Sequence, residues 1–299
     1  MEKIKVAIVG YGNIGKYALD AVLAAPDMEC VGIVRRSGSA EGCPELEGLK
    51  VVSDPCELGK IDVAILSTPS RKVGETARKY LALGINTVDS FDIHTSIADL
   101  RRDLGPIAAK AGAVSIISAG WDPGSDSVVR TLMAALVPEG VSYTNFGPGR
   151  SMGHTVAVKA IPGVRDALSM TIPEGRGIHS REVSIELEPG YDFETVAAAI
   201  KSDPYFVNDE TTVRLVPSVE AINTARHGVN LVREGVSGKT PDQKIVFDMK
   251  INNPALTGQM LVGAARATLR QAPGCYTMIE VPVIDFLPGE REELIRKLV

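Results

Sequence analysis

The sequence predicts an α/β protein, in which a Rossmann dinucleotide-binding domain is joined to a second α+β domain with a mixed sheet. Three observations support this prediction. First, the segment Gly10-Tyr11-Gly12-Asn13-Ile14-Gly15 lies between an apolar, β-branched run and a stretch with apolar residues at helical spacing. Second, strand and helix patterns alternate through residue 118. Third, the pattern from residue 167 onward is typical of an antiparallel or mixed sheet with helices on one face.

The glycine segment follows a predicted strand over 4–9 and precedes a predicted helix over 16–25. The first glycine allows the tight turn, the second lets the backbone approach a pyrophosphate, and the third lets helix and strand pack closely. The pyrophosphate then binds the free N–H groups of the helix N-terminus. We expect all six residues to contact the cofactor. The alternative is a glycine turn in an ordinary βαβ protein without a ligand.

The predicted second strand, residues 29–34, ends in Arg35-Arg36-Ser37 with no carboxylate before Glu41. A carboxylate at this position would bind the ribose 2′-hydroxyl of NAD and repel a 2′-phosphate. Two guanidinium groups would instead hold that phosphate. We therefore expect NADP(H) as the cofactor. A solvated basic loop is the alternative.

Composition limits the class of protein. The chain has 299 residues, which is enough for two domains. A net charge of −5 without a basic run argues against nucleic-acid binding. No apolar stretch reaches the roughly 18 residues of a membrane helix, and the chain enters a strand directly, without a signal peptide. The four cysteines match no metal or redox spacing, so we expect a cytoplasmic protein without a metal site.

In the first domain the predicted strands end in polar loops. Ser67-Thr68-Pro69-Ser70 follows one strand, and Ser90-Phe91-Asp92 follows the next. Ligands bind beyond the carboxyl ends of strands in a parallel sheet, so we expect both loops to contact the cofactor. The serine and threonine could also cap the following helix. Strands are predicted over 50–53, 61–66, 86–90 and 113–118, and helices over 71–83 and 98–111.

The pattern changes after Ala119. Ser125 or Asp126 caps a predicted helix that ends near Leu136, and glycines at 147, 149 and 153 then interrupt the chain. We expect a dinucleotide-binding domain over 1–122, to which 255–299 returns, and a substrate-binding and dimerisation domain over 123–254. Strands are predicted over 169–172, 178–187, 211–216, 228–233 and 244–252, and helices over 193–201 and 256–269.

Two strand-end carboxylates are candidates for the reacting end of a substrate. Asp92 and Asp122 could hold an ammonium or another polar group beside a nicotinamide. Each could equally be an N-cap or loop aspartate. Trp121 could form an apolar wall, although a lone tryptophan is more often a core residue.

The second domain offers polar candidates. The glycine-flanked segment 150–154 carries a cation, a hydroxyl and the imidazole of His154. An arginine with neutral donors suits a carboxylate, but spacing alone does not show that the residues converge. Arg181 could be an exposed strand residue and His227 a turn histidine. The candidates for this pocket are Thr171, Arg181, His227 and Asn253.

Longer segments, spread from end to end, are more specific than the glycine motif. They are 89–94 (Asp-Ser-Phe-Asp-Ile-His), 118–124 (Ser-Ala-Gly-Trp-Asp-Pro-Gly), 143–149 (Tyr-Thr-Asn-Phe-Gly-Pro-Gly), 151–154 (Ser-Met-Gly-His), 159–164 (Lys-Ala-Ile-Pro-Gly-Val), 251–255 (Ile-Asn-Asn-Pro-Ala) and 273–277 (Pro-Gly-Cys-Tyr-Thr). With them the chain resembles the meso-diaminopimelate dehydrogenases, in particular the shorter, thermophile-type branch.

The resemblance implies NADP-dependent, reversible oxidative deamination at the D-centre of meso-2,6-diaminopimelate. The products are L-2-amino-6-oxopimelate, which cyclises to tetrahydrodipicolinate, with ammonium and NADPH, in lysine and cell-wall precursor metabolism. It also implies a homodimer or a hexamer. Asp92 and Asp122 would bind the D-centre amine, and His154 is a candidate proton relay. Arg35 and Arg36 would take the 2′-phosphate. Trp121, Phe146, Met152 and Gly153 would line the pocket, and Thr171, Arg181, His227 and Asn253 would hold the L-centre.

Binding of the L-centre would select substrates by the distance between their two charged ends. A substrate without that centre would leave Arg181 buried without a partner, at a cost of about 1–3 kcal/mol or more. Two alternatives remain open. An aspartate-semialdehyde or dihydrodipicolinate reductase-like enzyme is one, but a semialdehyde dehydrogenase needs a nucleophilic cysteine, and Cys275 lies late in the chain. A non-catalytic NADPH-binding sensor is the other.

Overall fold

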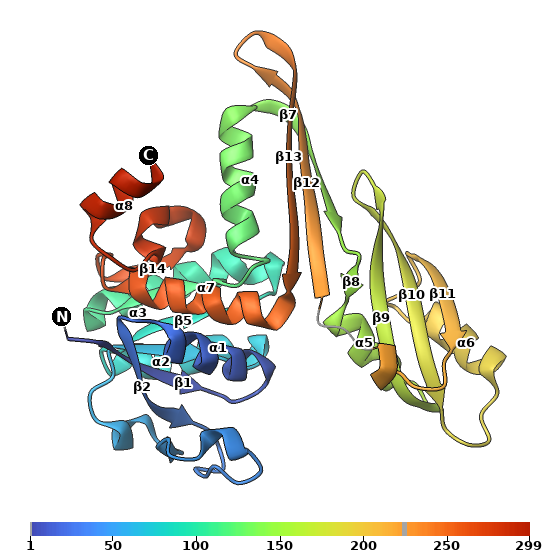
Figure 1. The fold of residues 1–299 in the computed structure, drawn as a ribbon, viewed down its shortest axis with the longest axis horizontal. Helices are drawn as coiled ribbons and strands as arrows, with labels where there is room; N and C mark the ends of the chain where they lie inside the picture. Colours follow the sequence, from blue (N-terminus) through green and yellow to red (C-terminus); the bar gives the residue numbers. More distant parts are fainter. Residues whose placement is uncertain (1, 223–225) are drawn as a thin grey trace. The chain divides into compact units, whose positions relative to one another are not determined.

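The computed structural model describes residues 2–222 and 226–299 (Figure 1). The chain forms two compact units, Met1–Thr131 with Pro254–Val299, and Leu132–Asn253. The first division falls inside helix α4 (Ser125–Leu136), later than the predicted boundary at 122. The reason is local. The amide of Ser125 donates to the carbonyl of Gly120 (3.1 Å), which ties the start of α4 to the loop before it.

The first unit is built on a parallel sheet of seven strands in the order β14-β6-β5-β4-β1-β2-β3. The strand order reverses between β1 and β4, which is where ligands bind in doubly wound sheets. The predicted fold class is confirmed. The strands are β1 (Ile4–Val9), β2 (Met28–Val34), β3 (Val51–Val52), β4 (Val63–Leu66), β5 (Asn86–Asp89), β6 (Val114–Ile117) and β14 (Gly274–Thr277).

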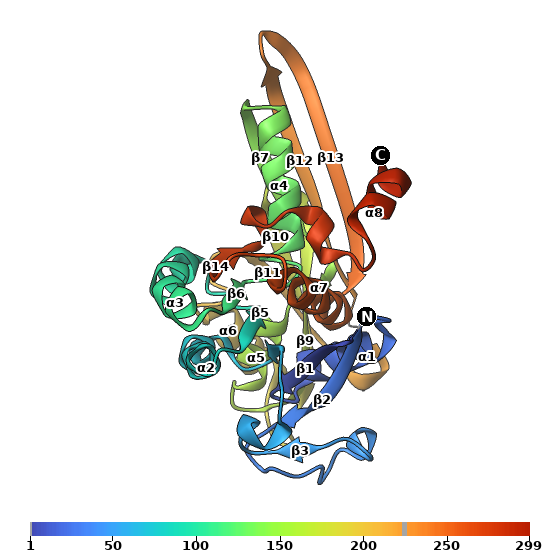
Figure 2. The ribbon, with the colours of Figure 1, turned by 90° about the vertical axis from the view of Figure 1, so that its left-hand side faces the viewer.

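Helices cover both faces of this sheet (Figure 2). Val6 and Ile8 of β1 pack with α1 and α7, while their neighbours Ala7 and Val9 pack with α2 and α3. This alternation follows from the two-residue period of a strand. The helices are α1 (Asn13–Ala24), α2 (Ser70–Ala82), α3 (Ile97–Ala111), α7 (Asn253–Thr268) and α8 (Arg291–Leu298), with short helices η1 (Pro44–Leu46), η2 (Pro55–Leu58), η3 (His94–Ser96), η5 (Met278–Glu280) and η6 (Val283–Phe286).

The second unit contains two sheets. One has the order β11-β10-β9-β8 and the other β13-β12-β7. Helix α6 packs on the first sheet, where Val196 and Ile200 meet Val183 and Ile185 of β10. The elements are β7 (Glu139–Phe146), β8 (Gly149–Arg150), α5 (Met152–Lys159), β9 (Val164–Gly175), β10 (Ile178–Leu187), α6 (Phe193–Ser202), β11 (Glu210–Leu215), η4 (Glu220–Ile222), β12 (Arg226–Ser237) and β13 (Thr240–Asn252).

Helices α5 and α8 and strands β7, β8 and β14 were not predicted from the sequence, and three of them show why. Helix α5 contains Gly153, a residue that disfavours helix interiors. Strand β7 exposes its first four residues and so lacks a clear apolar alternation. Strand β14 is only four residues long, and its pairing partner β6 lies far away in the sequence. In each case tertiary pairing overrides a weak or contrary local signal.

Candidate functional site

The glycine turn after β1 leaves space where a diphosphate would lie. Gly10 has φ +88°, and a Cβ there would lie 2.7 Å from the carbonyl oxygen of Ser67. A Cβ on Gly15 would lie 2.4 Å from the carbonyl oxygen of Gly10. At Gly12, by contrast, a Cβ would have no atom of the described chain within 4 Å. The turn is therefore closed toward the protein and open at its middle glycine.

Donor groups around this turn are available for a ligand. Gly12 is the N-cap of α1, and within the described structure no side chain caps this end and no acid lies in the first turn. The hydroxyls of Ser67 and Thr68, after β4, are buried without a hydrogen-bond partner among the described residues. Unpaired buried hydroxyls beside a free helix N-terminus fit a dinucleotide.

Arg35 and Arg36 follow β2 as expected. Arg36 is exposed, and Nη1 of the half-buried Arg35 lies 3.2 Å from Sγ of Cys43. Sequence reasoning missed Glu45 in η1, which pairs with Lys16 (Nζ–Oε1 2.8 Å). The hydrogen bond from Lys16, and to a lesser degree the charge of Arg35, lowers the pKa of Glu45. A carboxylate therefore lies near this loop, with Lys16 compensating its charge.

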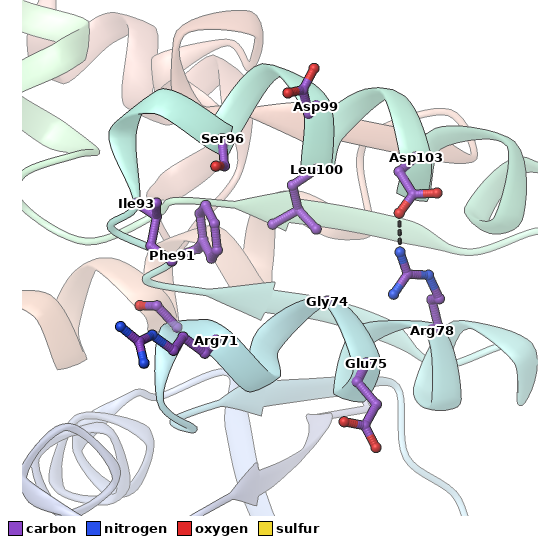
Figure 3. Close-up of a pocket in the computed structure, with 11 residues that line it drawn as sticks. Arg71, Gly74, Glu75, Arg78, Phe91, Ile93, Ser96, Asp99, Leu100 and Asp103 are labelled. Carbon is purple, nitrogen blue, oxygen red and sulfur yellow. Dashed lines mark hydrogen bonds and ion pairs between the residues drawn. The ribbon is translucent and has the colours of Figure 1, made fainter.

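The loops after β4 and β5 meet at the same sheet edge. Oγ of Ser70 lies 2.5 Å from Oδ1 of Asp92. Ser70 and Phe91 line one end of a surface groove of about 620 Å³ between α2 and α3. Figure 3 shows Arg71 and Phe91 at this end, and the Arg78–Asp103 ion pair at the other. Two of the loops expected to contact the cofactor thus lie side by side.

Asp89, the last residue of β5, is fully buried and was not singled out from the sequence. Its Oδ1 accepts the amides of Phe91 (2.9 Å) and Ser118 (3.0 Å), while Oδ2 has no partner among the residues described. Burial raises the pKa of Asp89 to about 6. This carboxyl group joins the loop that carries Asp92 to the loop that leads to Asp122.

Trp121 and Asp122 lie in the loop after β6, immediately before α4. The ring of Trp121 is buried. Nη2 of Arg130 lies 3.5 Å from Oδ1 of Asp122 and 2.6 Å from Oδ2 of Asp126. Sequence reasoning considered Asp126 only as a helix cap. The structure instead makes it a buried partner of the same guanidinium group.

In the second unit Thr171 and Arg181 face each other across β9 and β10. Nη1 of Arg181 donates to the hydroxyl of Thr171. Nε of Arg181 lies 2.6 Å from Oδ2 of Asp209, a residue that the sequence analysis missed. The expectation that Arg181 would lack a partner without substrate is therefore wrong, because Asp209 already compensates its charge. No sequence signal indicates Asp209, since its approach depends on the parallel pairing of β10 with β11.

Two histidines lie close enough to Arg181 to be affected by its charge. Burial and then the charge of Arg181 lower the pKa of His154 and of His179. Oγ of Ser151 lies 2.8 Å from Nδ1 of His154, and the Tyr205 main chain also bonds the imidazole. These contacts fix the imidazole of His154 at a place where the charge of Arg181 acts on it.

His179 was also missed by the sequence analysis. It lies two residues before Arg181 in β10, so both side chains are on the same face of the strand. Its Nε2 accepts the amide of Phe146 (2.8 Å), the last residue of β7. His227 is buried, and a Cβ on Gly149 would lie 2.4 Å from its Cα. Phe146 and His227 thus belong to the same unit as the candidates Thr171 and Arg181.

The remaining candidates are placed as follows. Gly153 is exposed in α5, and the side chain of Met152 lies outside the part of the chain that is described. Asn253 is the first residue of α7. The candidate residues therefore form two groups, one on each unit.

Two family profiles match the chain. The Diaminopimelic acid dehydrogenase C-terminal domain matches residues 120–253, and the Oxidoreductase family, NAD-binding Rossmann fold, matches residues 4–104. A curated Meso-diaminopimelate D-dehydrogenase of Bacteroides fragilis is 66% identical over 299 residues and covers 100% of both chains. The chain belongs to the meso-diaminopimelate D-dehydrogenase family. The expectations of an oxidoreductase and of an NAD(P)-binding Rossmann domain are confirmed, and the non-catalytic sensor is excluded.

Solved structures agree with this assignment. The C. glutamicum DAP dehydrogenase in complex with DAP has a TM-score of 0.87 at 29% identity, with 100% of both chains covered. An engineered D-amino acid dehydrogenase bound to NADP+ has a TM-score of 0.80 at 28% identity, covering 99% of this chain and 100% of that one. In the described part of this family member, no helix is long and apolar enough to cross a membrane.

Proposed function

We propose that the chain catalyses the NADP-dependent, reversible oxidative deamination of meso-2,6-diaminopimelate at its D-centre. The products are L-2-amino-6-oxopimelate, which cyclises to tetrahydrodipicolinate, with ammonium and NADPH. The observation that carries the proposal is the full-length identity of 66% to a curated meso-diaminopimelate D-dehydrogenase. We propose a role in lysine and cell-wall precursor metabolism in the cytoplasm.

NADP(H) is the proposed cofactor. Its diphosphate would take the open glycine turn and the amides of α1, and its 2′-phosphate would take Arg35 and Arg36. The nicotinamide, when bound, accepts the hydride. The unpaired hydroxyls of Ser67 and Thr68 offer hydrogen bonds at the same sheet edge. The complex of an engineered relative with NADP+ supports this choice.

Asp92 and Asp122 are the proposed partners of the D-centre amine. Both follow the carboxyl ends of neighbouring parallel strands, β5 and β6. An ammonium group has no lone pair, so one N–H bond must break before the C–H bond gives up its hydride. A carboxylate at hydrogen-bond distance can take that proton. Water then adds to the imine carbon, and ammonia leaves as the C–N bond breaks.

Arg181 and Thr171 are the proposed partners of the L-centre carboxylate, together with His227 and Asn253 of the same unit. Nε and Nη1 of Arg181 are occupied by Asp209 and Thr171, which fixes the direction of the guanidinium plane. Burial lowers the pKa of His154, and Nδ1 of its ring lies 2.8 Å from Oγ of Ser151. His154 stays the proposed candidate for a proton relay, because a neutral imidazole carries one donor and one acceptor nitrogen.

A homodimer is the proposed assembly, through the outer face of the sheet β13-β12-β7. Val246 and Tyr143 are both register partners of Val232, so the three side chains share that face. Val246 and Val141 are 52% and 56% exposed in the single chain. Light scattering should give the mass of a dimer, and Val246→Glu should shift it toward a monomer. A monomeric wild type would contradict the proposal.

The test of the reaction is nicotinamide reduction, followed at about 340 nm. Substrates are meso-, LL- and DD-diaminopimelate and D-alanine, each with NADP and with NAD. We expect turnover of the meso isomer with NADP. If none of these substrates is oxidised while NADPH still binds, the proposed reaction is wrong.

A pair of variants tests the proposed binding of the L-centre by Arg181. Arg181→Met should lower kcat/KM for meso-diaminopimelate by about tenfold or more, because it removes a charged hydrogen bond, and should leave D-alanine unchanged. Arg214→Met is the matched control, since Arg214 lies on the neighbouring strand with a side chain that is 61% exposed. Equal losses in both variants would contradict the assignment of Arg181.

A further inference from the structure

Helix α4 and the loop before it bring together two carboxyl groups and one guanidinium group. Nη2 of Arg130 is 2.6 Å from Asp126 and 3.5 Å from Asp122. The side chain of Asp126 is fully buried, and that of Asp122 is 11% exposed. One cation, whose own side chain is 33% exposed, therefore faces two acids that water scarcely reaches. Two ionised carboxylates in that position would repel each other strongly.

The backbone holds this cluster firmly. The amide of Asp126 donates to the carbonyl of Trp121 (3.0 Å). Gly124 has φ +147°, and a Cβ there would lie 1.9 Å from the carbonyl oxygen of Gly120. Any residue other than glycine at position 124 would therefore force the loop to move. Asp122 and Asp126 cannot separate easily to relieve their repulsion.

Few partners are available to the polar atoms of the cluster. Nε of Arg130 is buried without a hydrogen bond to any described residue, and Oδ1 of Asp122 and Oδ2 of Asp126 are buried with Arg130 as their ion-pair partner. Burial and the charge of Asp122 raise the pKa of Asp126 to about 8, although Arg130 opposes the shift. Asp126 therefore keeps its proton near pH 7. In the described part of the chain, the charged groups that act on it are Asp122 from the loop and Arg130 from α4.

We propose that Asp126 is a positioning residue that donates a hydrogen bond from its protonated carboxyl group to Asp122 and so orients the carboxylate that meets the substrate amine. This inference rests on the proposed function. With Asp126 neutral, Arg130 has one acidic group of the cluster to compensate instead of two.

The charge state matters for the chemistry. Two ionised carboxylates would stabilise the substrate ammonium and keep its proton on nitrogen. A single compensated carboxylate binds the ammonium less tightly. The ammonium is then less stabilised and more acidic, so its N–H bond can break with the proton passing to the carboxylate of Asp92, the other proposed partner of the amine, and the lone pair stays on nitrogen. Asp126 thus adjusts the basicity of the amine site without touching the substrate.

The experiment compares three variants by kinetics across pH. Asp126→Asn preserves shape and a donor, so kcat near pH 7 should stay within about threefold of wild type. Asp126→Leu keeps the approximate volume but removes the donor, so kcat should fall by about tenfold or more. Glu194→Gln, an exposed acid in the first turn of α6, is the matched control and should change nothing.

The pH dependence separates positioning from a structural role. The ratio of kcat for Asp126→Asn to that of wild type should be flat below about pH 8 and rise above it, because only the wild type ionises there. The ratio cancels the titration of the substrate amine. A flat ratio throughout, or an Asp126→Asn variant as impaired as Asp126→Leu, would overturn the inference.

A measurement without substrate completes the test. Infrared spectra at pH 7 should show the C=O stretch of a protonated carboxylic acid that Asp126→Asn loses and Glu194→Gln keeps. An active wild type that lacks this band overturns the role of Asp126 alone. A wild type that does not oxidise meso-diaminopimelate overturns the proposed function, and with it the role toward the amine, whatever the band shows.

Discussion

Replacing Asp89 with asparagine should remove a pH-dependent loss of stability. Asp89 is buried at the end of β5, and burial raises the pKa of its carboxyl group from an ordinary 3.8 to about 6. In the unfolded chain the group ionises near 3.8, but in the folded protein it keeps its proton up to about pH 6. Folding is therefore favoured below 3.8, and this contribution is lost as the pH rises through 6.

The size of the effect follows from the difference between the two pKa values. A change from 3.8 to about 6 corresponds to about 3 kcal/mol in the free energy of unfolding. Asparagine can still accept the amides of Phe91 and Ser118 through Oδ1 and does not titrate. The stability of Asp89→Asn relative to wild type should thus rise by about 2–3 kcal/mol between about pH 4 and about pH 7.

Urea unfolding of both proteins at several pH values measures this difference. Any fixed cost of the new amide group cancels, because it is the same at each pH. Glu194→Gln, which changes an exposed acid, serves as the control and should track the wild type. A difference between Asp89→Asn and wild type that stays constant with pH would refute the reasoning about the buried carboxyl group.

Three further predictions concern the cofactor and the L-centre. Gly12→Ala should weaken NADP binding by about tenfold or more at unchanged Tm, because the new methyl group points into the open turn. Gly15→Ala should lower Tm, because its Cβ would lie 2.4 Å from the carbonyl oxygen of Gly10. A lower Tm in both variants would contradict the open turn. Arg35→Ala should raise KM for NADP by about tenfold and leave KM for NAD unchanged, and equal changes would argue against the 2′-phosphate site. Asp209→Asn should cost about 2 kcal/mol in urea unfolding, because it removes the charge partner of Arg181; full stability would show that the pair is not needed.

Much of the first unit was predictable because its signals are local. The apolar run before Gly10, the glycine turn and the helical spacing after it all agree with one another, and the structure follows them. The strand ends that carry Asp92 and Asp122 were predictable for the same reason. Their contacts were not. That Ser70 meets Asp92, and that Asp89 links two loops, depends on which strands are neighbours.

The second unit was harder to predict. Arg181 and Thr171 could be named as polar strand residues, but their register becomes visible only when β9 and β10 pair. Asp209 and Glu45 change the charge of the two expected anion sites, and both lie in segments without a periodic pattern. Sequence patterns thus indicated where cations are placed, and the structure adds the acids that compensate them.

The first unit is assembled from both ends of the chain, which has a consequence for its synthesis. Strand β14 pairs with β6, and Arg266 of α7 forms two bonds to Asp27 (2.6 and 2.7 Å), with more than a hundred residues of the second unit in between. While the ribosome is still making that second unit, β6 is a bare sheet edge and the apolar surface under α7 is uncovered. The Rossmann sheet can therefore be completed only after the segment that carries β14 has left the ribosome. A chain that stops short of residue 274 would present β6 to other chains as a template for aggregation.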